Sequence, residues 1–198
     1  MAEGKGLLLV TMDPPPAMDE EFNDWYDAEH IPERAAIPGF HNARRFVCVE
    51  GWPRYLAHYD LSDVGVLATP AYQAVAGDRS SPWSKRILPR IRGLGRTEAV
   101  QIAPGDAVLG AKGPTARLAL WRLRGASEAG AVKGLREAFA GAVQLRVFRT
   151  RGEATDDLIA LAELGGAAPP DPAALGDAAR HLVQSNLYVP YFRQGRPS

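Results

Sequence analysis

The sequence predicts an α+β fold in which one chain forms two ferredoxin-like units, packed sheet to sheet as an intrachain α+β barrel. Strand-like and helical segments follow one another in the order β-α-β-β-α-β within residues 1–104, and the same order returns within residues 114–198. A segment rich in glycine and proline separates the two. The open sheet of one unit leaves a bare face, which the second unit would cover.

Composition narrows the possible functions. The 198 residues contain 23 Lys plus Arg and 23 Asp plus Glu, and this balance argues against a nucleic-acid-binding protein. The single cysteine, Cys48, excludes a disulfide within the chain and indicates a reducing, cytoplasmic compartment. The early apolar run at 7–10 is far shorter than the roughly 20 residues of a membrane span. Arginine far outnumbers lysine, which is typical of a GC-rich bacterial genome.

In the first half, an apolar strand at 7–12 is closed by three prolines, and a helix is expected from Asp19 to Ile31. At 100° per residue, its apolar stripe contains Met18, Phe22, Trp25 and Tyr26. Because Pro32 disfavours helical backbone before it, we expect this helix to end or kink near His30. The other expected elements are strands at 40–49, 55–61 and 97–103 and helices at 67–76 and 83–91.

The second half repeats this order more loosely. Ser127 is a suitable N-cap for a helix over 127–139, and Pro172 suits the first turn of a helix over 171–183. Strands are expected at 116–123, 143–150, 158–164 and 186–192. The alternative is a single α+β domain followed by unrelated helices and strands.

The densest group of candidate functional residues is FNDWYDAEHIPER, at 22–34. His30 falls at the edge of the apolar stripe beside Tyr26, with Asp27 three residues before it. The helix C-terminus and Asp27 would both favour the imidazolium form, which could donate a proton to a substrate. Alternatively, His30 only caps its helix and bonds Asp27. Glu29 falls inside the stripe, either as a base in an apolar pocket or because the ideal wheel misplaces it.

Two further candidates lie on the expected strands. His58 points either to the helix layer or to the cavity between the sheets, where it could polarise a substrate or be an inert core histidine. Arg44 and Arg45 face opposite sides of one strand. An inward Arg45 could clamp a substrate carboxylate, whereas a salt bridge at the rim is the simpler alternative. The sequence has no nucleophile motif, paired metal-binding histidines or dinucleotide fingerprint, so we predict neither metal nor cofactor.

Residues 21–34, followed by Pro38-Gly39-Phe40 and by ARRF at 43–46, resemble the EthD-like proteins of the dimeric α+β barrel superfamily. The resemblance covers residues 5 to 103. It implies ferredoxin-like units packed as a barrel, with small, often aromatic, molecules bound in a pocket of each unit. Relatives include muconolactone-type isomerases, polyketide cyclases, cofactor-free monooxygenases and more distant haem proteins. By position, the helix histidine of the family is His30.

The second half has no counterpart of the Asp27–His30–Pro32 cluster, so we expect it to stand in for a partner subunit, with a homodimer still possible. The predicted function is a cofactor-independent lyase, isomerase or cyclase acting on an aromatic, lactone or polyketide-like compound. His30 would be the acid/base and Asp27 its orienting partner. The alternative is a non-catalytic small-molecule binding or accessory protein of a catabolic pathway. The expected substrate contacts are Tyr26, Glu29, Arg45 and His58.

Overall fold

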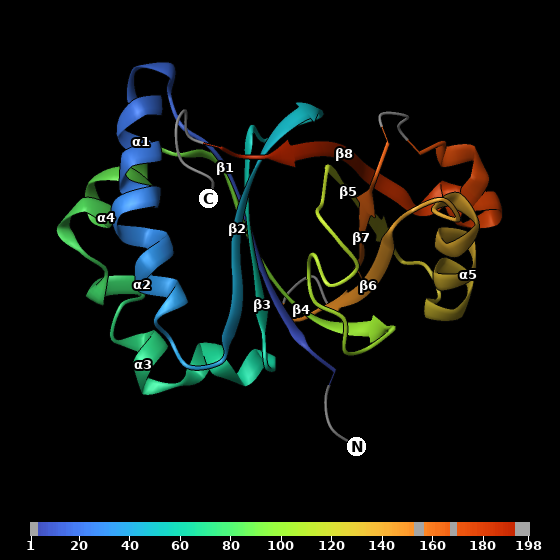
Figure 1. Cartoon of the computed structure of the whole chain (residues 1–198), viewed down its shortest axis with the longest axis horizontal. Coiled ribbons are helices and arrows are strands. Elements are labelled where there is room, and N and C mark those ends of the chain that lie inside the picture. The colour runs from blue at the N-terminus through green and yellow to red at the C-terminus, as the bar shows by residue number, and fades with distance from the viewer. Residues whose placement is uncertain (1–3, 153–156, 167–169, 193–198) are drawn as a thin grey trace.

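The computed structural model describes residues 4–152, 157–166 and 170–192, and its eight strands close into one barrel. The strands lie in the order β1-β3-β2-β8-β5-β7-β6-β4, each antiparallel to its neighbours (Figure 1). Their bounds are β1 Gly6–Asp13, β2 Phe40–Glu50, β3 Tyr55–Leu61, β4 Arg92–Ala103, β5 Arg117–Arg124, β6 Gln144–Thr150, β7 Asp157–Leu164 and β8 Leu182–Pro190.

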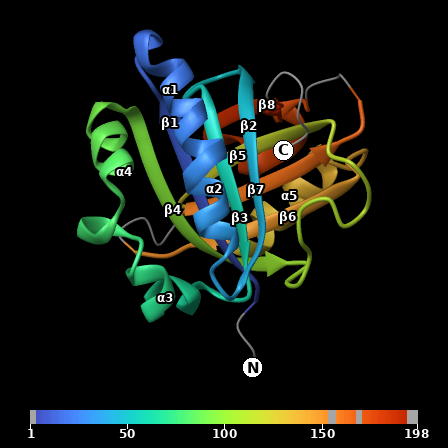
Figure 2. The same cartoon turned by 60° about the vertical axis from the view of Figure 1, so that its left-hand side comes forward.

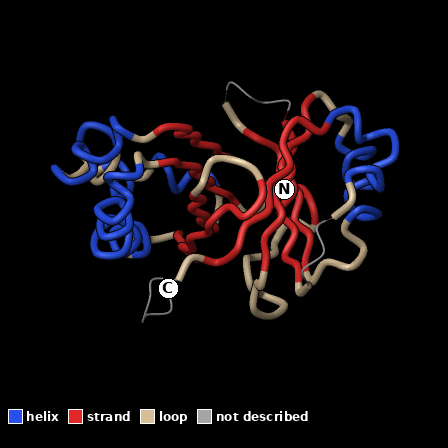
Figure 3. Tube along the Cα trace, turned by 90° about the horizontal axis from the view of Figure 1, so that it is seen from above, coloured by secondary structure: helices blue, strands red, loops and turns tan. Residues whose placement is uncertain are grey.

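Helices cover the outside of the barrel on two opposite sides, with the strands between them (Figure 3). Those of the first half are η1 Pro16–Met18, α1 Asp19–Trp25, η2 Tyr26–His30, α2 Ile31–Ala35, η3 Val64–Ala68, α3 Pro70–Gln73, η4 Gly77–Arg79, α4 Pro82–Ile87 and η5 Leu88–Arg90. Those of the second half are α5 Glu128–Ala138 and η6 Pro172–His181. Within the described ranges, none is both long and apolar enough to pass through a bilayer.

The two halves of the chain contribute four adjacent strands each, in the same relative order. The first half supplies β4-β1-β3-β2 and the second β8-β5-β7-β6. Two seams join them, because β2 pairs with β8 and β4 pairs with β6. The predicted closed α+β barrel is therefore confirmed as an eight-stranded antiparallel barrel. That each half is a separate ferredoxin-like unit stays a prediction.

Strand β3 shows how the sequence directs side chains to the two faces of the sheet. Successive side chains of a strand point to opposite faces. Tyr55, Ala57 and Tyr59 accordingly pack in the cluster under the helices, whereas Leu56 packs with the core inside the barrel. Every residue of β3 is buried, because helices cover its outer face and the opposite strands cover its inner face.

Of the two outcomes predicted near His30, an end or a kink, the helix at 19–35 does not end there, but its regular winding is interrupted at that point. It continues through α1, η2 and α2, and η2 is a π-helical turn in which the Ile31 N–H donates to the Tyr26 carbonyl, five residues earlier. A proline inside a regular helix presses on the carbonyl four residues before it. The wider π turn in front of Pro32 accommodates that ring, so the helix runs on to Ala35.

The other predicted elements are present, with shifted bounds. The predicted helix over 171–183 is instead the 3₁₀ segment η6, which is interrupted at Gly176, where φ is 57°. The last strand begins at Leu182, four residues before the predicted start. The glycine breaks the helical periodicity on which the prediction relied, because a positive φ cannot continue a right-handed helix.

Candidate functional site

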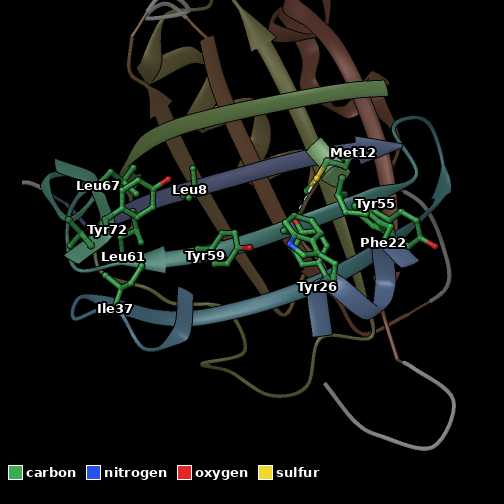
Figure 4. Close-up of a cluster of buried hydrophobic side chains, with 14 residues drawn as sticks. Leu8, Met12, Phe22, Tyr26, Ile37, Tyr55, Tyr59, Leu61, Leu67 and Tyr72 are labelled. Carbon is green, nitrogen blue, oxygen red and sulfur yellow. Dashed lines mark hydrogen bonds between the residues drawn. The ribbon is translucent and has the colours of Figure 1, made fainter. Parts of the chain in front are cut away.

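An aromatic layer lies between the helix at 19–35 and the outer face of the first half-sheet. Figure 2 shows α1 and α2 lying across β2 and β3. The predicted stripe supplies Phe22, Trp25 and Tyr26, all buried, and β3 supplies Tyr55 and Tyr59 (Figure 4). Ring centroids are 4.7 Å apart for Trp25 and Tyr26 and 5.1 Å apart for Phe22 and Tyr55. Such pairs add to the stability gained from burying the rings.

His30 packs its imidazole against this layer. The ring centroid lies 4.5 Å from that of Trp25 and 5.1 Å from that of Tyr26, and 13% of the side chain is exposed. Burial, reinforced by the positive charges of Arg34 and Arg45, lowers the pKa of His30 to about 3. The imidazole is therefore neutral near pH 7, and the predicted imidazolium is wrong because desolvation outweighs the helix terminus.

Asp27 turns toward β2. Its carboxylate accepts a hydrogen bond from Arg45 at 2.7 Å, and Asn23 Oδ1 accepts a second one from the same guanidinium at 2.5 Å. The guanidinium also lies 4.4 Å from the Tyr26 ring centroid and 4.0 Å from that of Tyr191. Arg45 thus faces the helix layer, with 3% of its side chain exposed. These contacts join β2 to the π turn, and the role of Asp27 as the orienting partner of His30 stays a prediction.

Three buried polar atoms in this layer have no hydrogen-bond partner among the described residues: His30 Nδ1, Arg34 Nη1 and Tyr59 Oη. The other terminal nitrogen of Arg34 donates to the Val75 carbonyl at 3.0 Å. The nearby Tyr26 hydroxyl donates to the sulfur of Met12, 3.6 Å away, and its interaction with the Tyr59 hydroxyl contributes to the pKa of both groups. Buried polar groups are nearly always hydrogen-bonded. Three unpaired atoms in one layer therefore point to a partner from outside the chain.

The charge of Arg34 links the other two groups. The charge of Arg34 helps to lower the pKa of His30 and opposes the rise that burial causes in the pKa of Tyr59. Figure 4 shows the Tyr59 hydroxyl directed along the sheet toward Tyr26. The sequence prediction assigned no role to Arg34 or Tyr59. The available signals were the i+4 spacing from His30 to Arg34 and the alternation along β3 that places Tyr59 on the helix side.

The remaining candidates lie elsewhere. His58 points into the barrel, on the opposite face of β3 from Tyr59, and its Nε2 lies 3.1 Å from Arg146 Nη2 and 3.3 Å from Asp60. Burial lowers its pKa to about 4. Glu29 accepts a hydrogen bond from the hydroxyl of Ser81. The structure therefore brings His30 together with Tyr26, but not with His58.

Two grooves lie away from His30. One, of about 410 Å³, runs between α5 and η6 and includes Ser127 and His181 in its lining. The other, of about 320 Å³, lies beside β2 and includes Arg44 and Leu109. Neither is lined by His30. No group of three or more His, Cys, Asp or Glu side chains in the described part of the chain is arranged to hold a metal ion.

A haem, the group bound by the more distant relatives, has no matching site at His30 or His58 in the grooves described above. His58 is enclosed by the packed barrel core, where Arg146 and Asp60 surround its Nε2. His30 packs its imidazole against Trp25 and Tyr26. An axial histidine needs an open apolar pocket large enough for the macrocycle, and neither of the two grooves is lined by His30 or His58.

Comparisons with known proteins identify the fold. No family model and no curated protein matches the sequence. Among solved structures, the chain is similar to an anthrone oxidase-like protein (TM-score 0.61, 13% identity, covering 96% of this chain and 92% of the other). A chlorite dismutase-like protein gives a TM-score of 0.60 at 11% identity, over 96% and 95% of the two chains. A monooxygenase-like protein from Fusobacterium nucleatum gives 0.54 at 6%, over 96% and 93%.

At these identities the likeness shows the fold alone. The chain therefore shares the barrel fold of these proteins, in agreement with the fold that the sequence resemblance implied. The resemblance to EthD-like proteins stays a prediction. The activities in the neighbours' names are theirs, and one fold hosts many chemistries. The reaction has to be argued from the residues.

Proposed function

We propose that this chain is a small-molecule enzyme that removes a proton from a weakly acidic aromatic substrate. The reaction site would lie between the helical segment 26–35 and the outer face of β3. The observation that carries the proposal is the set of three buried, unpartnered polar atoms on His30, Arg34 and Tyr59. A bound phenol or enol would supply the missing hydrogen-bond partners, and the surrounding rings would pack against its aromatic plane.

Each of these groups has a distinct task. The neutral imidazole of His30 accepts the proton, which the predicted imidazolium could not do. The guanidinium of Arg34 stabilises the anion that forms, because charge stabilisation is strong in a buried site. The Tyr59 hydroxyl donates a hydrogen bond to the substrate oxygen. The substrate anion in turn raises the proton affinity of His30 in the complex, since an opposite charge favours the charged imidazole.

Loss of a proton is a step that the alternative reactions share. An isomerase, lyase or cyclase returns the proton at another atom or eliminates a group from the anion. A cofactor-free monooxygenase lets the same anion react with dioxygen. Anthrone, the compound in the name of one structural neighbour, is an enolisable aromatic ketone of this kind. We therefore take planar, enolisable aromatic or polyketide-like compounds as the substrate class.

The rest of the molecule would serve this site. Residues 1–104 would be the unit that carries it, and residues 114–198 would replace the second subunit of a dimeric barrel. Each would be a ferredoxin-like unit, with the first of the EthD type. The surroundings would be the cytoplasm of a bacterium, where aromatic compounds are degraded or assembled. A homodimer of the whole chain is compatible with this arrangement.

The test follows proton removal directly, by NMR of anthrone in D₂O. We expect the protein to accelerate exchange of the C10 protons for deuterium. His30→Gln should slow the catalysed exchange about 100-fold, since general base catalysis contributes that much or more. His181→Gln, on exposed η6, is the matched control and should leave the rate unchanged. An oxygen electrode then separates monooxygenation, which consumes dioxygen, from isomerisation.

The alternative is a non-catalytic binding protein with the same site. It predicts that anthrone or 1-naphthol binds while the exchange rate equals that of buffer. That outcome, or an equal rate in the His30→Gln variant, would refute the proposed enzyme. Circular dichroism of His30→Gln must match the parent chain, so that loss of activity cannot be confused with loss of folding.

A further inference from the structure

The segment that joins β4 to β5 crosses one mouth of the barrel. The sequence marked it as a linker, rich in glycine and proline. It has neither strand nor helix between Ala103 and Arg117, yet Leu109 is buried and packs with the core inside the barrel. We call residues 105–113 the strap. Side chains of the barrel make hydrogen bonds to its main chain, as a protein does to a bound peptide.

Two carboxylates accept hydrogen bonds from neighbouring main-chain N–H groups of the strap. Asp60, from β3, accepts the Leu109 N–H at 2.8 Å. Glu163, from β7, accepts the Gly110 N–H at 2.9 Å and the Thr115 hydroxyl at 2.5 Å. Both carboxylates are buried. Each carboxylate also has a side-chain partner in the barrel, Arg146 for Asp60 at 2.7 Å and Gln144 for Glu163 at 2.6 Å. Because a buried carboxylate needs several donors, the N–H groups of the strap complete the partners of both.

Side-chain amides add further contacts. Asn42, from β2, donates to the Leu109 carbonyl at 3.1 Å, and Gln144, from β6, donates to the Val108 carbonyl at 2.8 Å. Gln101, from β4, binds the first part of the strap, at Gly105 and Ala107. Within 108–110, two carbonyls and two N–H groups are therefore each met by a side chain of the barrel. Recognition of main-chain groups is independent of the ligand's own side chains, apart from the pocket that takes Leu109.

The four side chains that bind 108–110 form two equivalent pairs, one from each half of the chain. Asn42 lies opposite Asp60 in the β2–β3 register, and Gln144 lies opposite Glu163 in the β6–β7 register. Since the halves share one strand order, the same two strands of each half present an amide and a carboxylate. We call these four residues the main-chain cradle.

The strap lies outside the hydrogen-bond ladder of the barrel. No ladder hydrogen bond of the eight strands passes through it, although the Gly105 carbonyl accepts the Lys5 N–H at 3.0 Å, and Leu109 is its buried apolar anchor. Gly105 and Gly113 lie at its ends with φ of 117° and 130°, and open space surrounds the Cα of each. Segments held by few apolar contacts open locally at lower free energy than the sheet they cover.

We propose that the main-chain cradle is a binding site for a peptide main chain, with the strap as its resident ligand. The strap dissociates and rebinds as a unit while the barrel stays folded. The ligand class is a short peptide turn with one apolar side chain. This site lies inside the barrel mouth, on the opposite face of β3 from His30, and does not depend on the proposed reaction.

The first test is amide hydrogen exchange of the full chain, followed by NMR. We expect the Leu109 and Gly110 amides to be protected, but to exchange faster than the ladder amides of β5 and β7. Glu163→Gln should speed exchange at Gly110 about tenfold, the effect of losing one hydrogen bond to a charged group. Glu137→Gln, on the exposed face of α5, is the control. Thr115→Val is a second, milder variant if Glu163→Gln does not fold.

Two outcomes of this test would overturn the proposal. One is exchange of the Leu109 and Gly110 amides at the rate of the ladder, because the strap would then open only when the barrel unfolds. The other is exchange at the rate of an unprotected peptide, because the cradle would then bind nothing in solution.

The second test supplies the ligand in trans. A fluorescently labelled peptide of residues 105–113, GDAVLGAKG, is added to the full-length Leu109→Gly variant, whose strap lacks its apolar anchor. We expect saturable binding, and at least tenfold weaker binding to the parent chain, where the tethered strap competes at millimolar effective concentration. A peptide with Leu109→Asp should not bind. Equal binding to both chains, or no binding to the variant, would contradict the assignment.

Discussion

Arg45 and Arg146 show how this fold keeps a guanidinium out of water. Arg45 lies between aromatic rings and pairs with Asp27, whose carboxylate is part-exposed. Arg146 lies inside the barrel and pairs with Asp60 at 2.7 Å. A buried charge persists only with a partner, so these positions tolerate little change. The sequence predicts that Arg44 and Arg45 face opposite sides of one strand, with one of them pointing inward or to a rim, but it does not reveal which partner that arginine meets.

Arg45→Met tests the first of these pairs. We expect the free energy of unfolding to fall by about 3 kcal/mol, because the substitution leaves Asp27 without its cation and removes the contact with the rings. Urea unfolding followed by tryptophan fluorescence measures this. Arg86→Met is the control, since Arg86 is 67% exposed in its pair with Glu21 and should change stability by less than about 1 kcal/mol. Equal losses of stability in the two variants would show that the contacts of Arg45 stabilise the fold no more than an exposed ion pair does.

The two buried histidines predict how stability depends on pH. The folded chain protonates His30 only near pH 3 and His58 only near pH 4, against about 6.5 for an unperturbed histidine. Between these values the unfolded chain binds more protons, so the free energy of unfolding is greatest above pH 6.5 and falls as the pH drops toward 4. Urea titrations at pH 7.5, 5.5 and 4.5 measure the slope. The slope should be smaller in the His30→Gln variant. A free energy of unfolding that does not change with pH would show that both imidazoles have ordinary pKa values.

At the scale of elements, the π turn η2 decides the geometry of the site. A regular helix advances 100° per residue, and the ideal wheel placed Glu29 within the apolar stripe. The π turn winds less per residue, so Glu29 turns away toward Ser81, at the start of α4. π turns inside helices are frequent at functional sites, which agrees with the location proposed here. Neither propensity nor spacing reveals such a turn, although Pro32 marked the place.

Ser81→Ala tests this junction between helices. The Ser81 hydroxyl caps α4 by accepting the Ser84 N–H at 2.9 Å, and it also donates to Glu29. We expect a loss of about 2 kcal/mol, the sum of a cap and a hydrogen bond to a carboxylate. Ser127→Ala removes only the exposed cap of α5 and should cost about 1 kcal/mol. Thermal unfolding measures the stability of both variants. Equal losses would mean that the hydrogen bond between Ser81 and Glu29 does not stabilise the fold.

Most strands could be predicted, because their patterning is local. The alternation in YLAHYDL at 55–61 predicts opposite faces for Tyr59 and His58, and the structure agrees. The charge state of His30 could not be predicted, since it depends on burial by Trp25 and on Arg34. The contacts of the strap could not be predicted either. Its glycines predict a linker, but they do not indicate which side chains bind it.

At the scale of the whole molecule, one ion pair bridges the halves inside the barrel. Asp60 lies on β3 of the first half and Arg146 on β6 of the second, 86 residues apart in sequence. Asp60 also binds the strap through the Leu109 N–H. One carboxylate therefore contacts both halves and the segment between them. We infer that this pair helps to fix how the halves meet at the β4–β6 seam.

A double-mutant cycle with Asp60→Asn and Arg146→Met tests this. Each single change should cost about 3 kcal/mol or more, because each leaves a buried group unpaired. The double variant should lose less stability than the sum of the two single losses, with a coupling energy of about 2 kcal/mol. The exposed pair of Arg149 and Glu128 is the comparison, and its coupling should be below about 1 kcal/mol. Additive losses at Asp60 and Arg146 would contradict a bridging role.

The most direct measurement of the central claim is a titration of the isotope-labelled chain with 1-naphthol, followed by NMR chemical shifts. The account predicts saturable shifts confined to the helical segment 26–35 and to the side chains of Tyr59 and Tyr72, which share its layer. Residues of α5, η6 and the barrel interior should not move. Shifts centred on the groove between α5 and η6, with none near His30, would contradict a reaction site under the first helix.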